Sequence, residues 1–225
     1  MPQLVLFDLD GTLADTAPDI LNAVNRTLAE AGCPPLALAT VRGLVSRGAR
    51  VLLDAGFPEP PEEADMDRLL GRLFAIYGET PAQETTVFPG LAELIAELGD
   101  AGIRWGVVTN KPVALAAPIV AALGLSPAPV CVIGGDSYAR KKPDPLPLLE
   151  ACRIAGVTPE KTVYVGDAEI DVRAARAAGM PCVVAGFGYA PEYEAVCAWD
   201  AEHYAASVGE LAQILGAPQN TAATA

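Results

Sequence analysis

Histidine is almost absent from this chain. The 225 residues contain one histidine, His203, and five cysteines with no Cys-x-x-Cys spacing. This composition lacks the ligand pattern of zinc sites and of thioredoxin-like redox motifs. His203 lies far along the sequence from the acidic motifs described below, so we expect it to have no catalytic role. The cysteines are typical of free thiols in a reducing compartment, and we therefore expect a cytoplasmic protein.

Basic residues are also scarce. The chain has 15 Lys and Arg against 28 Asp and Glu, which gives a net charge of −13. Nucleic acid and anionic membranes repel so acidic a surface, and we expect neither as a partner. Seven of the basic residues nevertheless fall in segments that carry the motifs below, which favours a site for a small anion. They are Arg42, Arg47, Arg50, Lys111, Arg140, Lys141 and Lys142.

Long apolar runs are missing as well. The longest, Val113 to Leu125, contains Pro118 and is too short to span a membrane. The first ten residues include two aspartates and no basic stretch, so we expect no signal peptide. Hydrophobic residues make up 52% of the chain, enough for a buried core. At this length we expect one large domain, or a core with a smaller insert.

An apolar run at residues 4–7 ends abruptly in acidic residues. Leu-Val-Leu-Phe predicts a strand buried on both faces, and Asp8, Asp10 and Gly11 follow it. Two carboxylates so close together disfavour each other's ionisation, and a bound cation removes that penalty. Asp8 is therefore a candidate carboxylate nucleophile, Asp10 a candidate general acid and base, and Mg²⁺ a candidate cofactor. Gly11 lets the backbone turn sharply beside a ligand. An ordinary Asp/Gly turn is the alternative.

A second buried strand, at residues 103–108, also ends in polar residues. The Thr109 hydroxyl and the Asn110 backbone N–H can donate to a phosphate oxygen near the start of the next helix. Thr109 as a simple helix cap is the alternative. Further on, Lys141 and Lys142 precede Pro-Asp-Pro, a rigid approach to another helix. Either lysine could lie at the surface.

A third strand, at residues 162–166, leads into Asp167, and Asp171 follows in the first turn of a helix. This spacing allows both carboxylates to face one pocket. Strands alternating with helices predict an α/β fold with a doubly wound, Rossmann-like parallel sheet. Such sheets bind ligands beyond the carboxyl ends of their strands. We expect the last core strand at residues 181–186, followed by an irregular loop up to a final helix at 207–215.

Residues 15–85 have helical periodicity and no convincing strand. We interpret this block as an inserted all-helical cap domain, with the core formed by residues 1–14 and 86–225. Within it, residues 42–50 place three arginines around two glycines and a serine. We interpret this stretch as a substrate-facing turn, with Arg42 or Arg50 reaching the substrate's anionic or polar end. A solvated basic face is the alternative. The turn contributes four candidate binding residues: Arg42, Ser46, Gly48 and Arg50.

Phe-Asp-Leu-Asp-Gly-Thr-Leu at residues 7–13 resembles the first motif of the haloacid dehalogenase superfamily. Thr109, Lys142 and Asp167 match the later motifs in type, order and spacing, and the resemblance covers about residues 4–215. The Lys-Pro-Asp-Pro match favours Lys142 over its neighbour Lys141. In the superfamily, a block such as residues 15–85 is a lid that closes over the site.

The resemblance also implies roles for these residues. It implies that Lys142 neutralises the nucleophile and the phosphate. It implies that Mg²⁺ is bound by Asp8, by the Asp10 carbonyl and by Asp167, with Asp171 as an outer partner or a support for Lys142. The protein would then be a phosphomonoester hydrolase that acts on a small phosphorylated metabolite, as a monomer or a homodimer.

Several segments resemble the phosphoglycolate phosphatase group, which makes 2-phosphoglycolate the expected substrate. These segments are residues 15–19, 42–43, 48–50, 107–112 and 142–145. A branch that acts on N-acetylmuramic acid 6-phosphate is the alternative, because several stretches resemble that branch even more closely, namely residues 105–113, residues 186–189 and Trp199. The motifs do not separate the two.

Three other functions fit less well. A dehalogenase needs no second acid, so Asp10 argues against it. A mutase of the beta-phosphoglucomutase type carries a cap histidine, and residues 14–85 have none. A catalytically silent binding protein would be expected to lose one of the four motifs, and none is lost.

Overall fold

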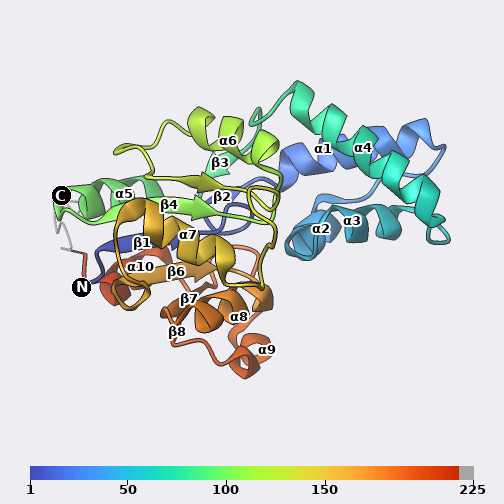
Figure 1. The fold of residues 1–225 in the computed structure, drawn as a ribbon. Coiled ribbons are helices and arrows are strands. Elements are labelled where there is room, and N and C mark those ends of the chain that lie inside the picture. Colours follow the sequence, from blue (N-terminus) through green and yellow to red (C-terminus); the bar gives the residue numbers. More distant parts are fainter. Residues whose placement is uncertain (218–225) are drawn as a thin grey trace, which may run out of the picture.

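The computed structural model describes residues 1–217, which form two lobes (Figure 1). The larger lobe is a parallel sheet with helices on both faces, and the smaller lobe is a group of four helices, α1 to α4. The elements in chain order are β1 (Leu4–Phe7), β2 (Ala14–Asp15), α1 (Ala17–Glu30), α2 (Leu38–Leu44), η1 (Val45–Arg47), α3 (Ala49–Gly56), α4 (Glu63–Glu79), β3 (Thr86–Val87), α5 (Leu91–Asp100), β4 (Arg104–Val108), α6 (Val113–Ala122), β5 (Val132–Ile133), α7 (Leu146–Ala155), η2 (Pro159–Lys161), β6 (Thr162–Gly166), α8 (Glu169–Ala178), β7 (Cys182–Ala185), α9 (Tyr193–Val196), η3 (Cys197–Trp199), β8 (His203–Ala205) and α10 (Val208–Leu215).

The sheet has the strand order β5-β4-β1-β6-β7-β8, and every neighbouring pair is parallel. This arrangement confirms the predicted α/β class. The first strand lies in the interior of the sheet, and its last residue, Phe7, pairs with Val107 of β4 and Val165 of β6. Because the three strands are in register, the residues that follow them emerge side by side at one edge of the sheet.

The prediction for the chain after residue 186 was wrong. We expected an irregular loop, whereas β8 pairs with β7 through Val183 to His203 and Ala185 to Ala205 and adds a sixth strand. Three residues at a sheet edge carry little periodicity, and their strand conformation depends on pairing with β7 rather than on their own propensity. His203 is exposed there.

The alternation of side chains along β1 explains why the whole strand is apolar. Leu4 and Leu6 belong to the core on one face of the sheet, which α7 and α8 cover. Val5 and Phe7 belong to the core on the other face, which α5, α6 and α10 cover. Successive side chains of a strand point to opposite faces, so a strand covered on both sides has no place for a polar residue until it ends.

The smaller lobe follows the helical pattern seen in the sequence. Helices α1 and α4 pack along their length, with Val24, Leu28 and Leu73 among the buried side chains. The short antiparallel pair β2 and β3 connects the lobes, with Ala14 opposite Val87 (Figure 1). The core segment that we predicted runs to residue 225, and its last part, 218–225, lies outside the described residues. Within residues 1–217, no helix combines the length and the apolar character that crossing a bilayer requires.

Candidate active site

The carboxyl edge of the sheet gathers the polar residues predicted from three separate strands. Asp8 follows β1, Thr109 follows β4, and Asp167 follows β6. The register of the strands brings these residues together, because the three strands end within one residue of one another. The three side chains are buried, Thr109 to 3% exposure and Asp167 to 1%. Such burial is costly for carboxylates that have no partner, so their surroundings matter.

Lys142 supplies one of these partners. It comes from the loop between β5 and α7, and its Nζ lies 3.1 Å from Asp8 Oδ1 and 2.7 Å from Asp171 Oδ1. It also donates to the Tyr164 hydroxyl at 2.7 Å. Burial alone would lower the pKa of Lys142, but Asp171 and Asp8 raise it above the usual lysine value, so the ammonium stays charged. Lys141, the neighbouring candidate, is exposed.

Three carboxylates form a tight acidic cluster around this ammonium. Oxygens of Asp8, Asp167 and Asp171 all lie within 4.8 Å of one another. Burial raises the pKa of Asp8 to about 6, while Lys142 lowers it and the nearby acids raise it. Burial, followed by repulsion from Asp8 and Asp171, raises the pKa of Asp167 well above its usual range. The cluster therefore holds more negative charge than one ammonium balances.

These residues fit a divalent cation with oxygen ligands. Asp8 and Asp167 have oxygens directed into the cluster, and hard cations such as Mg²⁺ bind carboxylates of this kind. Asp171 is less available to a cation, because both of its oxygens already accept hydrogen bonds, one from Lys142 Nζ and the other from the Ala168 backbone N–H at 3.0 Å. Asp167 accepts from Thr12 Oγ1 at 3.0 Å and from the Ser46 hydroxyl.

Asp10 lies apart from the acidic cluster and has its own partners. Its Oδ1 accepts from Lys111 Nζ at 2.7 Å and from Thr16 Oγ1 at 2.6 Å. The two carboxylates that follow β1 are thus matched to different cations, Asp8 to Lys142 and Asp10 to Lys111. The two carboxylates therefore lie in different electrostatic surroundings.

Gly11 shapes the turn that separates them. Its φ of +78° is unfavourable for residues with a side chain. A Cβ at this position would collide with the Tyr189 ring and lie 2.8 Å from Asp167 Oδ2. The Tyr189 N–H also donates to the Gly11 carbonyl at 3.1 Å. Gly11 therefore lets the loop after β1 pass close to the acidic cluster.

The residues of the predicted substrate-facing turn, 42–50, have different contacts in the structure. Ser46, Gly48 and Arg50 line the cavity between the lobes. Arg50, however, forms an ion pair with Glu63. Arg42 does not line the cavity, because its guanidinium pairs with Asp15 at 2.6 Å in the connection between the lobes.

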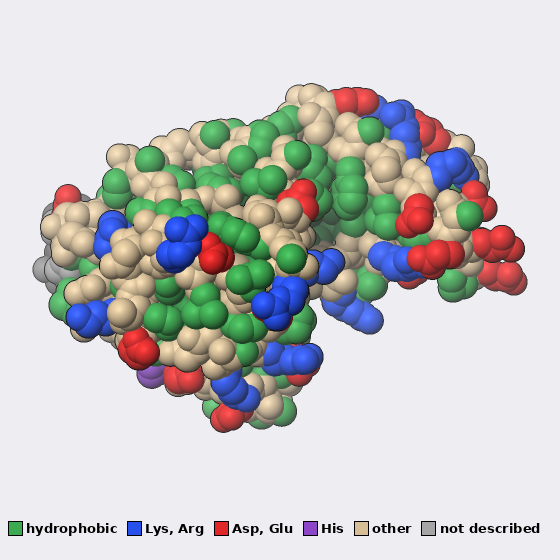
Figure 2. Space-filling view, in the orientation of Figure 1, with side chains coloured by type: hydrophobic (Ala, Val, Ile, Leu, Met, Phe, Trp, Pro, Cys, Tyr) green, Lys and Arg blue, Asp and Glu red, His purple; other side chains and the backbone are tan. Residues whose placement is uncertain are grey.

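A cavity of about 500 Å³ opens between the lobes, and Asp8 and Asp10 are among the residues that line it. Figure 2 shows the hollow where the lobes meet, with several Lys and Arg side chains around it. Asp8, Thr109 and Lys142 lie on the core side of the cavity. The other wall is apolar and comes mainly from the smaller lobe. It consists of Ile20, Ala23, Val45, Leu52, Leu70, Leu73 and Phe74, with Leu115 from α6.

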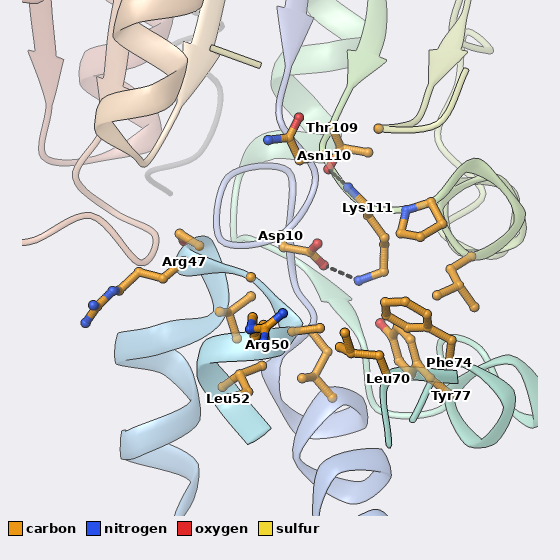
Figure 3. Close-up of a pocket in the computed structure, with 18 of the residues that line it drawn as sticks. Asp10, Arg47, Arg50, Leu52, Leu70, Phe74, Tyr77, Thr109, Asn110 and Lys111 are labelled. Carbon is orange, nitrogen blue, oxygen red and sulfur yellow. Dashed lines mark hydrogen bonds and ion pairs between the residues drawn. The ribbon is translucent and has the colours of Figure 1, made fainter. Parts of the chain in front are cut away.

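Two cavity residues carry buried polar atoms without a hydrogen-bond partner among the described residues. They are Tyr77, at its hydroxyl oxygen, and Asn110, at Oδ1. The Asn110 Nδ2 donates to the Lys142 carbonyl at 2.9 Å, which fixes the orientation of the amide group. Figure 3 shows Tyr77 entering the cavity from α4 and Lys111 from the loop after β4, while Arg47 points away from both.

The sequence analysis counted Lys111 among the basic residues of the site segments but gave it no role, and it did not include Tyr77 as a candidate. The signal for Lys111 was its place beside Thr109 and Asn110, at the end of a central strand. Tyr77 falls on the apolar side of its helix, with Leu73 and Leu70, where it is indistinguishable from a core residue.

Comparison with known proteins gives consistent matches over most of the chain. The family model described as haloacid dehalogenase-like hydrolase matches residues 5–185. A protein named phosphoglycolate phosphatase from Xanthomonas campestris pv. campestris is 45% identical over 204 residues, 89% of this chain and 90% of its own length. One named N-acetylmuramic acid 6-phosphate phosphatase from Pseudomonas putida is 38% identical over 185 residues, 82% of this chain and 83% of its own.

The fold has close counterparts among solved structures. The crystal structure of a predicted phosphoglycolate phosphatase from Haemophilus somnus 129pt superposes with a TM-score of 0.83 at 26% identity. The match covers 95% of this chain and 97% of the other. The similarity therefore extends over both the sheet and the helical lobe.

Proposed function

The chain belongs to the haloacid dehalogenase-like hydrolases, and we propose that it is a Mg²⁺-dependent phosphatase that hydrolyses 2-phosphoglycolate. One observation carries the proposal. Asp8 lies at the bottom of a cavity between two lobes, 3.1 Å from a buried lysine and beside two further buried carboxylates. This arrangement supports the roles of Asp8 as nucleophile, of the carboxylates as a cation site and of the lysine ammonium as a phosphate-binding group, all within reach of one phosphoryl group.

We propose that Asp8, the Asp10 carbonyl and Asp167 hold Mg²⁺, with Asp171 supporting Lys142. When bound, Mg²⁺ neutralises charge on the phosphoryl oxygens and on the carboxylates around it. The raised pKa values of Asp8 and Asp167 support this assignment, because they reflect burial first and then repulsion from neighbouring acids, and a bound cation would favour the ionised carboxylates.

The residues of the chain then divide the chemistry between two steps. In the first, Asp8 attacks phosphorus and forms an aspartyl-phosphate, while Asp10 gives a proton to the departing alcohol oxygen. In the second, Asp10 takes a proton from water, which attacks the aspartyl-phosphate and frees phosphate. Lys142 and Thr109 donate to the phosphoryl oxygens, and the Asn110 backbone N–H adds a further donor.

The helical lobe serves in this proposal as a cap domain, residues 15–85, that closes over the site. Its contribution is to exclude water during the first step and to reopen for the second. The hydrogen bond from Ser46 to Asp167 supports this function, because it joins the two lobes at the acidic cluster.

The cavity favours a second candidate substrate, N-acetylmuramic acid 6-phosphate. A volume of about 500 Å³ with an apolar wall exceeds what a two-carbon acid fills. The relative from Pseudomonas putida with that substrate in its name supports the same candidate. Both compounds are phosphomonoesters that also carry a carboxylate.

The test is steady-state phosphate release with Mg²⁺ from both compounds in one preparation. We expect kcat/KM for 2-phosphoglycolate to be higher by about 10²-fold or more, a ratio typical of a pocket that recognises the whole substrate. The reverse ratio would identify the second candidate. Poor rates on both would contradict the substrate, and failure to release phosphate from any phosphomonoester would contradict the phosphatase function.

Thermal stability provides a test of the cation site. Because the folded-state pKa of Asp8 is about 6, above its usual 3.8, the stability that Asp8 contributes without metal is present below pH 4 and is lost as the pH rises through 6. Mg²⁺ binds the ionised carboxylates, so it should stabilise the protein more at pH 8 than at pH 5. At one hundred times Kd the gain is about 2.7 kcal/mol, or a rise in Tm of roughly 5–10 °C.

The control for this measurement compares two isosteric variants. Asp167→Asn should lose most of the Mg²⁺-dependent rise in Tm. Asp136→Asn should keep it, because Asp136 lies at the cavity and, among the described residues, accepts only from the Val113 N–H at 2.8 Å, as an amide oxygen also can. A rise in Tm that is equal at both pH values, or that survives in Asp167→Asn, would contradict the site.

A further inference from the structure

Lys111 has donor capacity that its contacts do not use. Its Nζ lies 2.7 Å from Asp10 Oδ1 and 4.6 Å from the centroid of the Tyr77 ring. An ammonium has three N–H donors, and among the described residues the carboxylate of Asp10 is its one hydrogen-bond acceptor. The side chain is only 7% exposed, and it points into the cavity rather than to solvent (Figure 3).

Tyr77 presents an unpartnered donor to the same cavity. The residue is 6% exposed, and its hydroxyl has no hydrogen-bond partner in the part of the chain that the structure describes. Native proteins rarely leave a buried hydroxyl unpaired, so one that faces a ligand cavity indicates a missing partner. Its surroundings on α4 are apolar, with Leu70, Leu73 and Phe74 lining the same wall.

The charge around the cavity favours an anionic partner. The lining residues include five basic and three acidic side chains, in a chain whose net charge is −13. Lys142 is already engaged by Asp8 and Asp171 at the phosphate end, and Arg50 by Glu63 at the surface. Lys111 is therefore the buried cation best placed for a second group of the substrate.

We propose that Lys111 and Tyr77 form a receptor for a carboxylate on the substrate, distinct from the phosphate-binding residues. This inference rests on the proposed phosphatase function. One ammonium shared with Asp10 and one neutral phenol suit a single negative charge, whereas a second phosphate would require more positive charge. The apolar wall beyond Tyr77 would then contact the carbon atoms next to that carboxylate.

The same contacts allow a simpler role, in which Lys111 only positions Asp10. The two roles predict different effects on substrate choice. A residue that acts through Asp10 would affect every phosphomonoester alike. A carboxylate receptor would affect only substrates that carry the carboxylate, and would thus change the ratio of two kcat/KM values.

The test compares 2-phosphoglycolate with its nearly isosteric neutral amide, 2-phosphoglycolamide. In Lys111→Met we expect the acid-to-amide ratio of kcat/KM to fall about 30-fold or more, since a charged hydrogen bond is lost. In Tyr77→Phe, which keeps the ring and removes the hydroxyl, we expect a fall of about 5–10-fold. The matched controls Lys161→Met and Tyr193→Phe, both outside the cavity, should leave the ratio unchanged.

Binding to Asp8→Asn keeps this test independent of turnover. Isothermal titration calorimetry with the Asp8→Asn variant should show tighter binding of 2-phosphoglycolate than of 2-phosphoglycolamide. Adding Lys111→Met to that variant should remove the difference in affinity. Equal binding of both compounds, or an unchanged ratio in both Lys111→Met and Tyr77→Phe, would overturn the receptor. An equal loss on both compounds would also overturn it and would leave Lys111 as a positioning residue. If the wild type released no phosphate from either compound but the Asp8→Asn variant still bound the acid more tightly than the amide, the phosphatase function would be contradicted and the receptor would not.

Discussion

In the Asp8→Asn variant we expect kcat for phosphate release to fall by about 10⁴-fold or more, because both steps depend on the nucleophile. An amide of the same size cannot form the aspartyl-phosphate. The fold should survive, because the Leu9 N–H that donates to Asp8 Oδ1 at 2.8 Å can still donate to an amide oxygen. Steady-state phosphate release, with a thermal melt of each variant, checks both expectations.

The comparison with Asp10→Asn makes this experiment specific to the nucleophile. p-Nitrophenyl phosphate has a good leaving group and needs no acid in the first step. Asp10→Asn should therefore release about one equivalent of p-nitrophenol in a burst and then stall, because water is not activated. Asp8→Asn should give no burst. Substantial turnover by a folded Asp8→Asn variant would refute the assignment of Asp8.

The sequence was most informative where the chain changes character locally. Asp8, Thr109 and Asp167 each follow a buried apolar strand, and a polar residue there is visible without knowledge of the fold. The parallel arrangement of alternating strands and helices then places them at one edge. The structure brings these residues together because Phe7 pairs with both Val107 and Val165.

The sequence was least informative about which charges pair. Arg42 and Arg50 stand eight positions apart in one basic stretch, yet one pairs with Asp15 and the other with Glu63. Neither partner is implied by periodicity, because the orientation of a long side chain depends on how separate elements pack. The same limit applies to Lys111, whose partner Asp10 lies 101 residues away along the chain.

Ser46 makes a contact between the two lobes that could not be predicted from the local sequence pattern. Its hydroxyl reaches Asp167, so a residue of the helical lobe contacts the acidic cluster of the core. The turn that carries it was recognisable by its glycines and arginines. The residue it contacts depends on how the two lobes come together around β2 and β3.

The second large effect is expected at Lys142, where stability and activity should fall together. Lys142→Met leaves the buried carboxylates of Asp8 and Asp171 without the ammonium that lies 3.1 and 2.7 Å from them. Removing one partner of a buried pair costs about 3–5 kcal/mol, or a fall in Tm of roughly 6–20 °C. Loss of a preorganised donor to the phosphoryl group should lower kcat by about 10²–10³-fold.

Lys141→Met is the matched control for stability. Lys141 is exposed, so its loss should change the free energy of unfolding by no more than about 0.5 kcal/mol. The double variant Lys142→Met/Asp171→Asn separates the two effects. Removing the acid that has lost its counter-ion should restore part of the Tm. It should not restore activity, because Asp8 and the phosphate still lack the ammonium. Recovery of both, or wild-type activity in Lys142→Met, would show that Lys142 stabilises the fold without binding phosphate.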